Sequence, residues 1–264
     1  MFSKFLAVLL VLFISTSAMA TSLSFLHGKT FRDDQGYSKQ RTTMTLEHFG
    51  LWEGGNIFFY YDITDPFKAP PNQYVKGYGH QPGAQQFFGG FTVNWSFNKL
   101  FDANLNGFVK DMYIHTEVEN GSGNGLFGFR NYFLGLQADI AVPGFDFFTV
   151  NTLLRDNPLQ PGVGVQLGAA WQMSQEWARW RRFKFTGFVA TAPWDGNGDR
   201  QNKAVDKFGR FLTAQPQLLW DLGNGIWGKP NRLETGFEYG YFLNRFQALH
   251  KDEKVLQAMV KFSW

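Results

Sequence analysis

The sequence predicts an all-β fold, a transmembrane antiparallel β-barrel of about twelve strands of the outer-membrane type. Three observations predict it. Apolar residues recur at every second position in many short segments, the period of a strand with one apolar and one polar face. Aromatic residues make up 18% of the chain, although its mean hydropathy is slightly negative. The final alternating segment, 256–264, ends on Trp264. A barrel reconciles these facts, because its aromatics face lipid and its polar groups face inward.

The N-terminus predicts export. Lys4 precedes an apolar run over 5–14, and small residues at Ala18 and Ala20 suit a signal peptidase, so we expect a signal peptide, 1–20, cleaved after Ala20. Ten apolar residues are too few for a membrane-spanning helix. Residues 21–264 then form a single barrel domain. The chain has no cysteine, so no disulfide supports it, as in many bacterial envelope proteins.

Composition argues against several partners and cofactors. The net charge is only +3, and no cluster of lysine and arginine resembles a nucleic-acid footprint, so we expect no nucleic-acid partner. No two of the five histidines are close in sequence, which predicts no metal site and no cofactor. The segment 195–199 resembles the start of a calcium loop but has no later glutamate at the required spacing, which favours a surface turn.

Alternation and turn residues divide the chain into twelve predicted strands. They lie near 22–30, 41–52, 56–63, 87–97, 106–118, 128–141, 146–155, 163–175, 182–193, 209–222, 232–244 and 254–264. An even number places both termini on the periplasmic side. The longest connections, 64–86 and 194–208, then lie outside the cell, as bacterial barrels require.

Tryptophans support this orientation. Five of the six strands that run toward the periplasm end with an outward tryptophan: Trp52, Trp95, Trp171, Trp220 and Trp264. Such a girdle places the chain among outer-membrane lipids. Trp264 also resembles the terminal aromatic by which the barrel assembly machinery recognises its clients. Two residues fit poorly, His48 on the lipid face and Pro216 within a strand, and each suggests a bulge that reverses the local register.

The inward positions hold the candidate site, because that face of the strands is polar and rich in aromatics. The candidate pore-lining residues are Glu47, Tyr60, Asp62, Phe88, Asp111, Phe133, Lys184, Glu234 and Glu238. The same face carries Tyr113, His115, Glu117, Asp139, Phe188, Gln215, Gln217, Phe242 and Lys261. A water-filled barrel needs a polar lining whether or not it binds a solute. Rings beside carboxylates could nevertheless stack on a planar base and hydrogen-bond a sugar, forming weak sites that a solute enters and leaves.

An outer-membrane hydrolase is the alternative from another class. A serine hydrolase needs a serine, a histidine and an acid or amide within hydrogen-bond reach. The chain has no G-x-S-x-G motif, and nothing in the sequence pairs His48 with Ser96 or Ser174. The sequence therefore favours a channel over an enzyme.

Several segments resemble the Tsx-type nucleoside-specific channels of the outer membrane. They are Leu46-Glu47-His48-Phe49, then Gly55 and 58–62 ending in Asp62, then 95–100, and the aromatic Gly-Leu and Asp-Ile segment 132–140. The order of these segments extends the resemblance over most of the mature chain. It implies a twelve-stranded monomeric barrel with a narrow lumen that passes nucleosides passively, and relatives that serve as phage and colicin receptors.

Only Glu47 and Asp62 carry over with a motif match, and Tyr60 and Phe133 follow. The resemblance implies that the two carboxylates bond ribose hydroxyls or base amines while the rings of Tyr60, Phe88 and Phe133 stack. The connections 64–86 and 194–208 differ from the family, which leaves open other small solutes or a role chiefly as a phage or colicin receptor.

Overall fold

A computed structural model describes residues 19–31, 40–67, 85–122, 128–157, 162–178, 180, 182–194, 210–244 and 252–264. It contains β1 (Met19–Lys29), β2 (Gln40–Trp52), β3 (Gly55–Thr64), β4 (Gln86–Ser96), β5 (Val109–Ser122), β6 (Gly128–Ile140), β7 (Phe147–Asp156), β8 (Val163–Glu176), β9 (Arg182–Thr191), β10 (Leu212–Ala214), β11 (Gln217–Asp221), β12 (Leu233–Leu243) and β13 (Glu253–Ser263). Two short helices, α2 (Phe97–Phe101) and α3 (Leu222–Trp227), follow β4 and β11.

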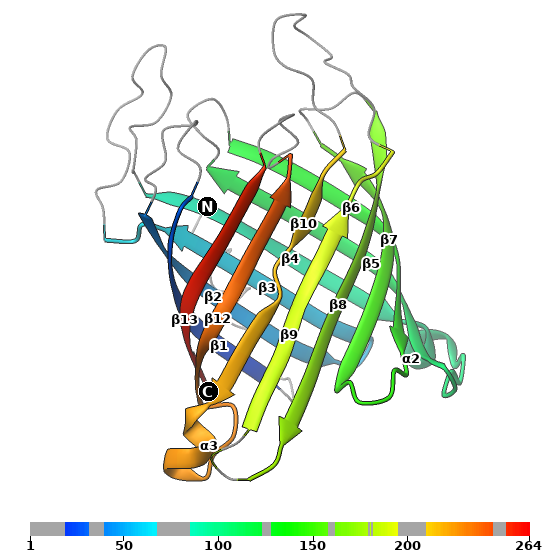
Figure 1. Ribbon diagram of the computed structural model, residues 1–264. Helices are drawn as coiled ribbons and strands as arrows, with labels where there is room; N and C mark the ends of the chain where they lie inside the picture. The colour runs from blue at the N-terminus through cyan, green and yellow to red at the C-terminus, as the bar shows by residue number, and fades with distance from the viewer. Residues whose placement is uncertain are drawn as a thin grey trace, which may run out of the picture.

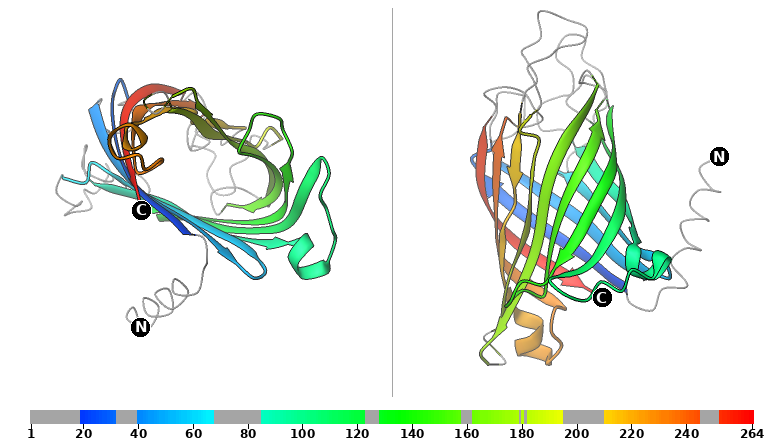
Figure 2. Two further views of the ribbon diagram at one scale, coloured as in Figure 1. Left: turned by 90° about the horizontal axis from the view of Figure 1, so that it is seen from below. Right: turned by 90° about the vertical axis from the view of Figure 1, so that its right-hand side faces the viewer.

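The strands form one closed antiparallel barrel (Figure 1). Apart from β10 and β11, which each pair with β9 and β12, every strand pairs with its neighbour in the chain, and β13 pairs with β1 to close the ring. Because β10 and β11 share one place between β9 and β12, the ring has twelve positions, which confirms the predicted fold class. Figure 2 shows that its cross-section is elongated rather than circular.

The interruption between β10 and β11 lies at Gln215 and Pro216, as the proline suggested. The register is nevertheless the same on both sides of the gap: Ala214 faces Val189 and Gln217 faces Thr186, so no residue is inserted. The backbone N–H of Gln215 still donates to Phe188 O at 3.0 Å. The expectation of a reversed register at Pro216 was therefore wrong, because the strand loses pairing locally without shifting.

The chain ends meet at the closure. The backbone N–H of Trp264 donates to Thr21 O at 3.0 Å, and that of Thr21 to Trp264 O at 3.5 Å. β1 begins at Met19, two residues before the predicted cleavage point, so cleavage after Ala20 would make Thr21 the first residue of the strand. Most of the predicted signal peptide lies outside the described residues.

The strand register puts the predicted tryptophans on the outer face, toward the end of the barrel where α2, α3 and the C-terminus lie (Figures 1 and 2). The rings of Trp52 and Trp95 meet edge to face at 5.2 Å, and those of Phe262 and Trp264 stack at 6.0 Å. Of the residues in the described ranges, no helix is long and apolar enough to cross a bilayer.

His48 keeps its outward register, paired with Phe59, so the expected reversal there was also wrong. Its side chain is only 2% exposed, because it stacks on the Phe59 ring at 5.3 Å and hydrogen-bonds Thr21 Oγ1 at 2.8 Å. The surrounding groups shield the imidazole from lipid, which explains how a polar residue occupies this face.

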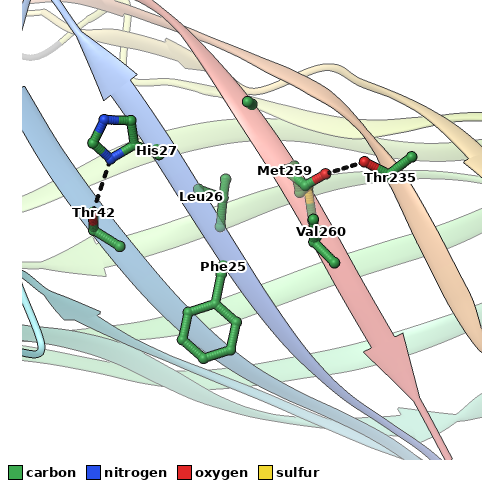
Figure 3. Close-up of a pocket in the computed structure, with 8 residues that line it drawn as sticks. Phe25, Leu26, His27, Thr42, Thr235, Met259 and Val260 are labelled. Atoms are coloured by element: carbon green, nitrogen blue, oxygen red, sulfur yellow. Dashed lines mark hydrogen bonds between the residues drawn. The ribbon is translucent and has the colours of Figure 1, made fainter.

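A second polar group on the outer face lies near the opposite end of the barrel, where β1 ends and β2 begins. His27 contacts Thr42 Oγ1 and Gln40 Nε2, each at 3.0 Å, beside an apolar hollow whose rim includes Phe25 and Val260 (Figure 3). Polar side chains of this kind belong at the level of the lipid head groups. They and the tryptophan girdle mark the two edges of the apolar band.

Candidate functional site in the barrel interior

Every predicted inward residue takes an inward position in the strand register. The face is fixed by β13, where buried and exposed side chains alternate from Glu253 to Val260. Cross-strand partners point to the same side of a sheet, so the pairing of each strand with the next identifies the inward residues around the whole ring. The predicted and observed inward residues agree because the side-chain period of a strand is two. A register shift of one residue would have turned every side chain of that strand to the other face.

Glu47 lies in a chain of alternating charges. Lys261 Nζ donates to Glu47 Oε2 at 2.5 Å, passing over β1, where Ser22 Oγ also donates to the same oxygen at 3.1 Å. Lys261 is the cross-strand partner of Glu234, whose carboxylate binds Lys184 Nζ at 2.7 Å. The structure thus joins four charged side chains from β2, β13, β12 and β9 into one network that balances its own charge.

Tyr60 is the centre of an aromatic group on β3 and β4. Its ring lies 5.6 Å from that of Phe88 and 6.1 Å from that of Phe58. Its hydroxyl donates to Glu119 Oε1 at 3.0 Å, and Asn131 Nδ2 donates to the other oxygen of Glu119 at 3.0 Å. Aromatic rings, a carboxylate and an amide therefore occur together at this position.

Asp62 follows Tyr60 on the same inward face, where Thr45 donates to it at 2.6 Å. Asp62 is the cross-strand partner of Phe88, and Glu47 is that of Tyr60. Four of the predicted pore-lining residues thus occupy neighbouring positions on β2, β3 and β4.

Glu238, on β12, is held by amides. Gln215 and Gln257 donate to its Oε1 at 3.0 and 2.9 Å, and Gln217 donates to its Oε2 at 2.8 Å. Glu238 is 5% exposed, so three neutral donors satisfy a buried carboxyl group. Asp62 and Glu47 lie near enough to interact with it electrostatically.

Two predicted residues are engaged by the scaffold. Asp111 accepts from Ser96 Oγ at 2.5 Å and from the backbone N–H of Asn98 at 3.1 Å, which fixes the start of α2. Phe133 is 5% exposed and faces Arg155 and Glu117 on the adjacent strands.

Sequence reasoning missed Glu119 and Arg155. Glu119 was assigned to a loop, because the glycines and asparagines that follow it are typical of turns, but β5 continues to Ser122. Arg155 reaches the Phe211 ring at 4.9 Å and interacts electrostatically with Glu119. Arg155 could have been found from the sequence, because it occupies an inward position at the end of the predicted seventh strand.

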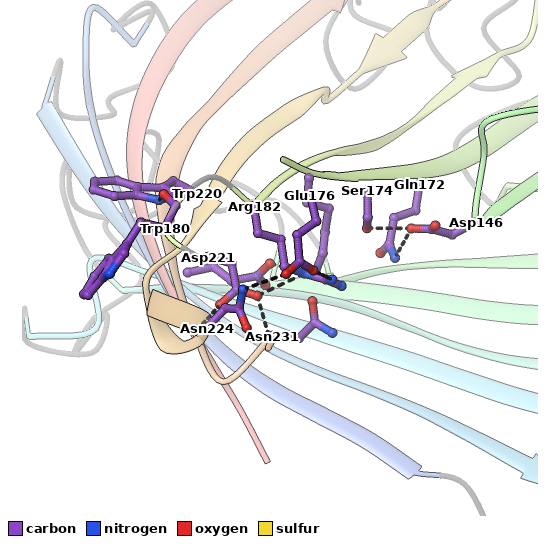
Figure 4. Close-up of polar contacts among 12 residues, drawn as sticks. Asp146, Gln172, Ser174, Glu176, Trp180, Arg182, Trp220, Asp221, Asn224 and Asn231 are labelled. Carbon is purple, nitrogen blue, oxygen red and sulfur yellow. Dashed lines mark hydrogen bonds and ion pairs between the residues drawn. The ribbon is translucent and has the colours of Figure 1, made fainter. Parts of the chain in front are cut away.

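A polar network lies beside α3 at one end of the barrel (Figure 4). Asp221 accepts from the backbone N–H groups of Asn224 at 2.9 Å and Asn231 at 2.7 Å, and it pairs with Arg182 at 3.2 Å. Arg182 also binds Glu176 at 2.8 Å. These contacts join the β8–β9 and β11–β12 connections.

The interior contains packed apolar side chains as well as polar ones. Leu26, Leu219 and Met259 pack together inside the barrel, and His115 and Asn131 are buried on other strands. Barrels of eight strands are filled by side chains, whereas those of sixteen or more hold a wide channel. A ring of twelve strands lies between these two sizes. Within the described ranges, no group of His, Asp or Glu is arranged to hold a metal ion.

No protein-family model matches the sequence, and no curated protein matches it. Among solved structures, the chain is similar to the KdgM porin, with a TM-score of 0.48 and 11% identity over 92% of this chain and 99% of that one. It is also similar to the NanC porin, with a TM-score of 0.43 and 8% sequence identity over 93% of this chain and 98% of that one. A third similar structure is the translocator domain of the autotransporter NalP from Neisseria meningitidis, with a TM-score of 0.40 and 11% sequence identity over 99% of this chain and 93% of that one. Identities and TM-scores this low do not assign the chain to a family.

Proposed function

We propose that the protein is a passive channel of the bacterial outer membrane for nucleosides or similar small solutes. The closed barrel supports a membrane location, because its outer face is apolar between a tryptophan girdle and a polar edge. The concentration gradient alone drives transport. The resemblance to the Tsx-type channels points to the same class of solute.

One observation carries the choice of solute. The rings of Tyr60 and Phe88 lie beside the carboxylates of Asp62 and Glu119 on one face of the interior. A base can stack on such rings, which contributes about 1–3 kcal/mol per base. The carboxylates accept hydrogen bonds from ribose hydroxyls or from a base amine. Both halves of a nucleoside therefore find matching groups.

Planar-bilayer conductance tests the proposal. We expect adenosine, at micromolar to millimolar concentration, to block the current while glucose at the same concentration leaves it unchanged. Asp62→Ala and Glu47→Gln weaken this block, whereas Asp156→Asn, an outward carboxylate at the end of β7, leaves it unchanged. A conducting barrel that adenosine does not block would exclude nucleosides and leave other small solutes.

Two alternatives to a nucleoside channel are a surface receptor and a hydrolase. A phage or colicin receptor would use the extracellular connections, and most of 64–86 and 194–208 lies outside the described residues. A hydrolase gains no support from the described histidines, whose hydrogen bonds join His27 to Thr42 and Gln40, His48 to Thr21, and His115 to Glu117.

A further inference from the structure

The inner face of the barrel is strongly negative, although the whole chain is slightly positive. In the described strands, eleven carboxylates take inward positions: Glu47, Asp62, Asp111, Glu117, Glu119, Asp139, Glu176, Asp221, Glu234, Glu238 and Glu253. Five cations do so: Arg41, Arg155, Arg182, Lys184 and Lys261. With every group in its ordinary ionised form, the inward strand positions carry a formal net charge of −6, which the small positive charge of the sequence conceals.

Four of the five cations lie on the β9–β2 side of the ring, and the fifth, Arg155, lies on β7. Lys184, Lys261 and Arg182 each lie within an ion pair on the β9–β2 side. The inward positions of β3, β4, β5 and β6 that the structure describes hold no lysine or arginine. Neutral donors and His115 contact most of the carboxylates on these strands, as when Thr45 donates to Asp62. Arg155 on the neighbouring β7 interacts electrostatically with Glu119.

Charge of one sign in a narrow, protein-lined passage has a predictable effect. Low-dielectric walls concentrate the field along the passage, which raises the local concentration of counter-ions and lowers that of co-ions. Rings of Asp and Glu produce cation preference in this way in other pores. Because the excess is spread over several strands, the preference belongs to the whole inner face and not to one binding site.

We infer that this channel selects cations over anions, and that its solutes are neutral or carry an amine rather than a carboxylate or phosphate. The inference rests on the proposed channel function and narrows it, since it admits nucleosides and excludes nucleotides. It also sets this chain apart from an acidic-sugar channel: one KdgM porin structure is described as a complex with oligogalacturonate, an acidic oligosaccharide.

Reversal potentials in planar bilayers test the inference. With a tenfold KCl gradient, we expect K⁺ to permeate several-fold faster than Cl⁻. Asp62→Asn and Glu117→Gln each lower the permeability ratio by up to about fourfold, because one unit charge at roughly 10 Å in water changes the local concentrations of K⁺ and of Cl⁻ by about twofold each, in opposite directions. Asp156→Asn removes the same charge from the outer face and leaves the ratio unchanged.

Solute flux into liposomes gives a second readout with sugars of similar size. We expect glucosamine and glucose to enter faster than glucuronate, and the double variant Asp62→Asn/Glu117→Gln to reduce the difference. A preference for Cl⁻, or equal entry of the three sugars, would overturn the selectivity while leaving the channel intact. A folded barrel with no conductance and no sugar flux would overturn the channel proposal and the selectivity together.

Discussion

A single glycine decides where the Tyr60 ring lies. A Cβ atom on Gly90 would meet Tyr60 Cε1 at 2.7 Å and Glu117 Oε1 at 3.1 Å. Without a side chain at this position, the Tyr60 ring lies over β4 and its hydroxyl reaches Glu119 on β5. The hydrogen bond joins residues 59 apart in sequence, so alternation could place Tyr60 inward but could not predict this partner.

Gly90→Ala therefore tests the aromatic site. We expect the added methyl group to displace the Tyr60 ring and weaken adenosine block by about tenfold, within the range of one lost stacking contact. The bilayer titration measures it. Gly107→Ala is the matched control, because no atom lies within 4 Å of its Cβ position. An unchanged block in the Gly90 variant, with the barrel folded, would remove Tyr60 from the solute path.

At the scale of elements, strands were easier to predict than the ends of strands. Twelve segments of period two lie within a few residues of the observed strands, because a half-buried face imposes alternation on its sequence. The end of β5 was missed, because residues 119–122, which are rich in turn-forming types, are hydrogen-bonded as strand residues to β6.

The helices were missed for a different reason. α2 and α3 have five and six residues, too few to show a helical period. Their caps were readable: Ser96 and Asp221 accept from backbone N–H groups at the two starts, and Gly228 ends α3 in the left-handed region.

Asp221→Ala tests how strongly α3 is tied to the barrel. The carboxylate is 1% exposed, caps α3 and pairs with Arg182. We expect its loss to lower the free energy of unfolding by about 2 kcal/mol, since a cap and a charged hydrogen bond disappear together. Denaturant unfolding of the barrel in lipid vesicles measures it. Asp156→Ala, an exposed carboxylate at a strand end, is expected to change the value by less than about 0.5 kcal/mol. Equal effects would show that α3 contributes nothing beyond an ordinary surface loop.

For the whole molecule, the sequence predicts which residues face inward but not which of them meet. Lys261 and Glu47 bond across 214 residues, and their contact exists only because β13 closes on β1 and β1 lies beside β2. A pairing of this kind depends on strand number and register together. The acidic inner surface likewise emerges only when every strand has its place, because the charges alternate too sparsely along the chain to be seen as a cluster.

Closure also gives Trp264 two separable roles. Its backbone completes the ladder with Thr21, and its ring stacks on Phe262 at the lipid edge. Trp264→Ala keeps the backbone pairing with Thr21 but removes the aromatic ring, whereas deletion of Trp264 removes the pairing and the ring together. If the barrel assembly machinery recognises the terminal aromatic, the alanine variant inserts slowly and reaches nearly normal stability, and Trp264→Phe inserts at the normal rate.

Deletion of Trp264 should lower both the insertion rate and the stability, because the ladder at the closure loses its last pair. Gel mobility before and after heating separates folded from unfolded barrels in membranes sampled over time. Phe25→Ala is the matched control, an aromatic on the same outer face of β1, 39% exposed and away from the terminus. Normal insertion of Trp264→Ala would show that the ring only anchors the finished barrel in lipid, and slow insertion of Phe25→Ala as well would show a general need for aromatics rather than a terminal signal.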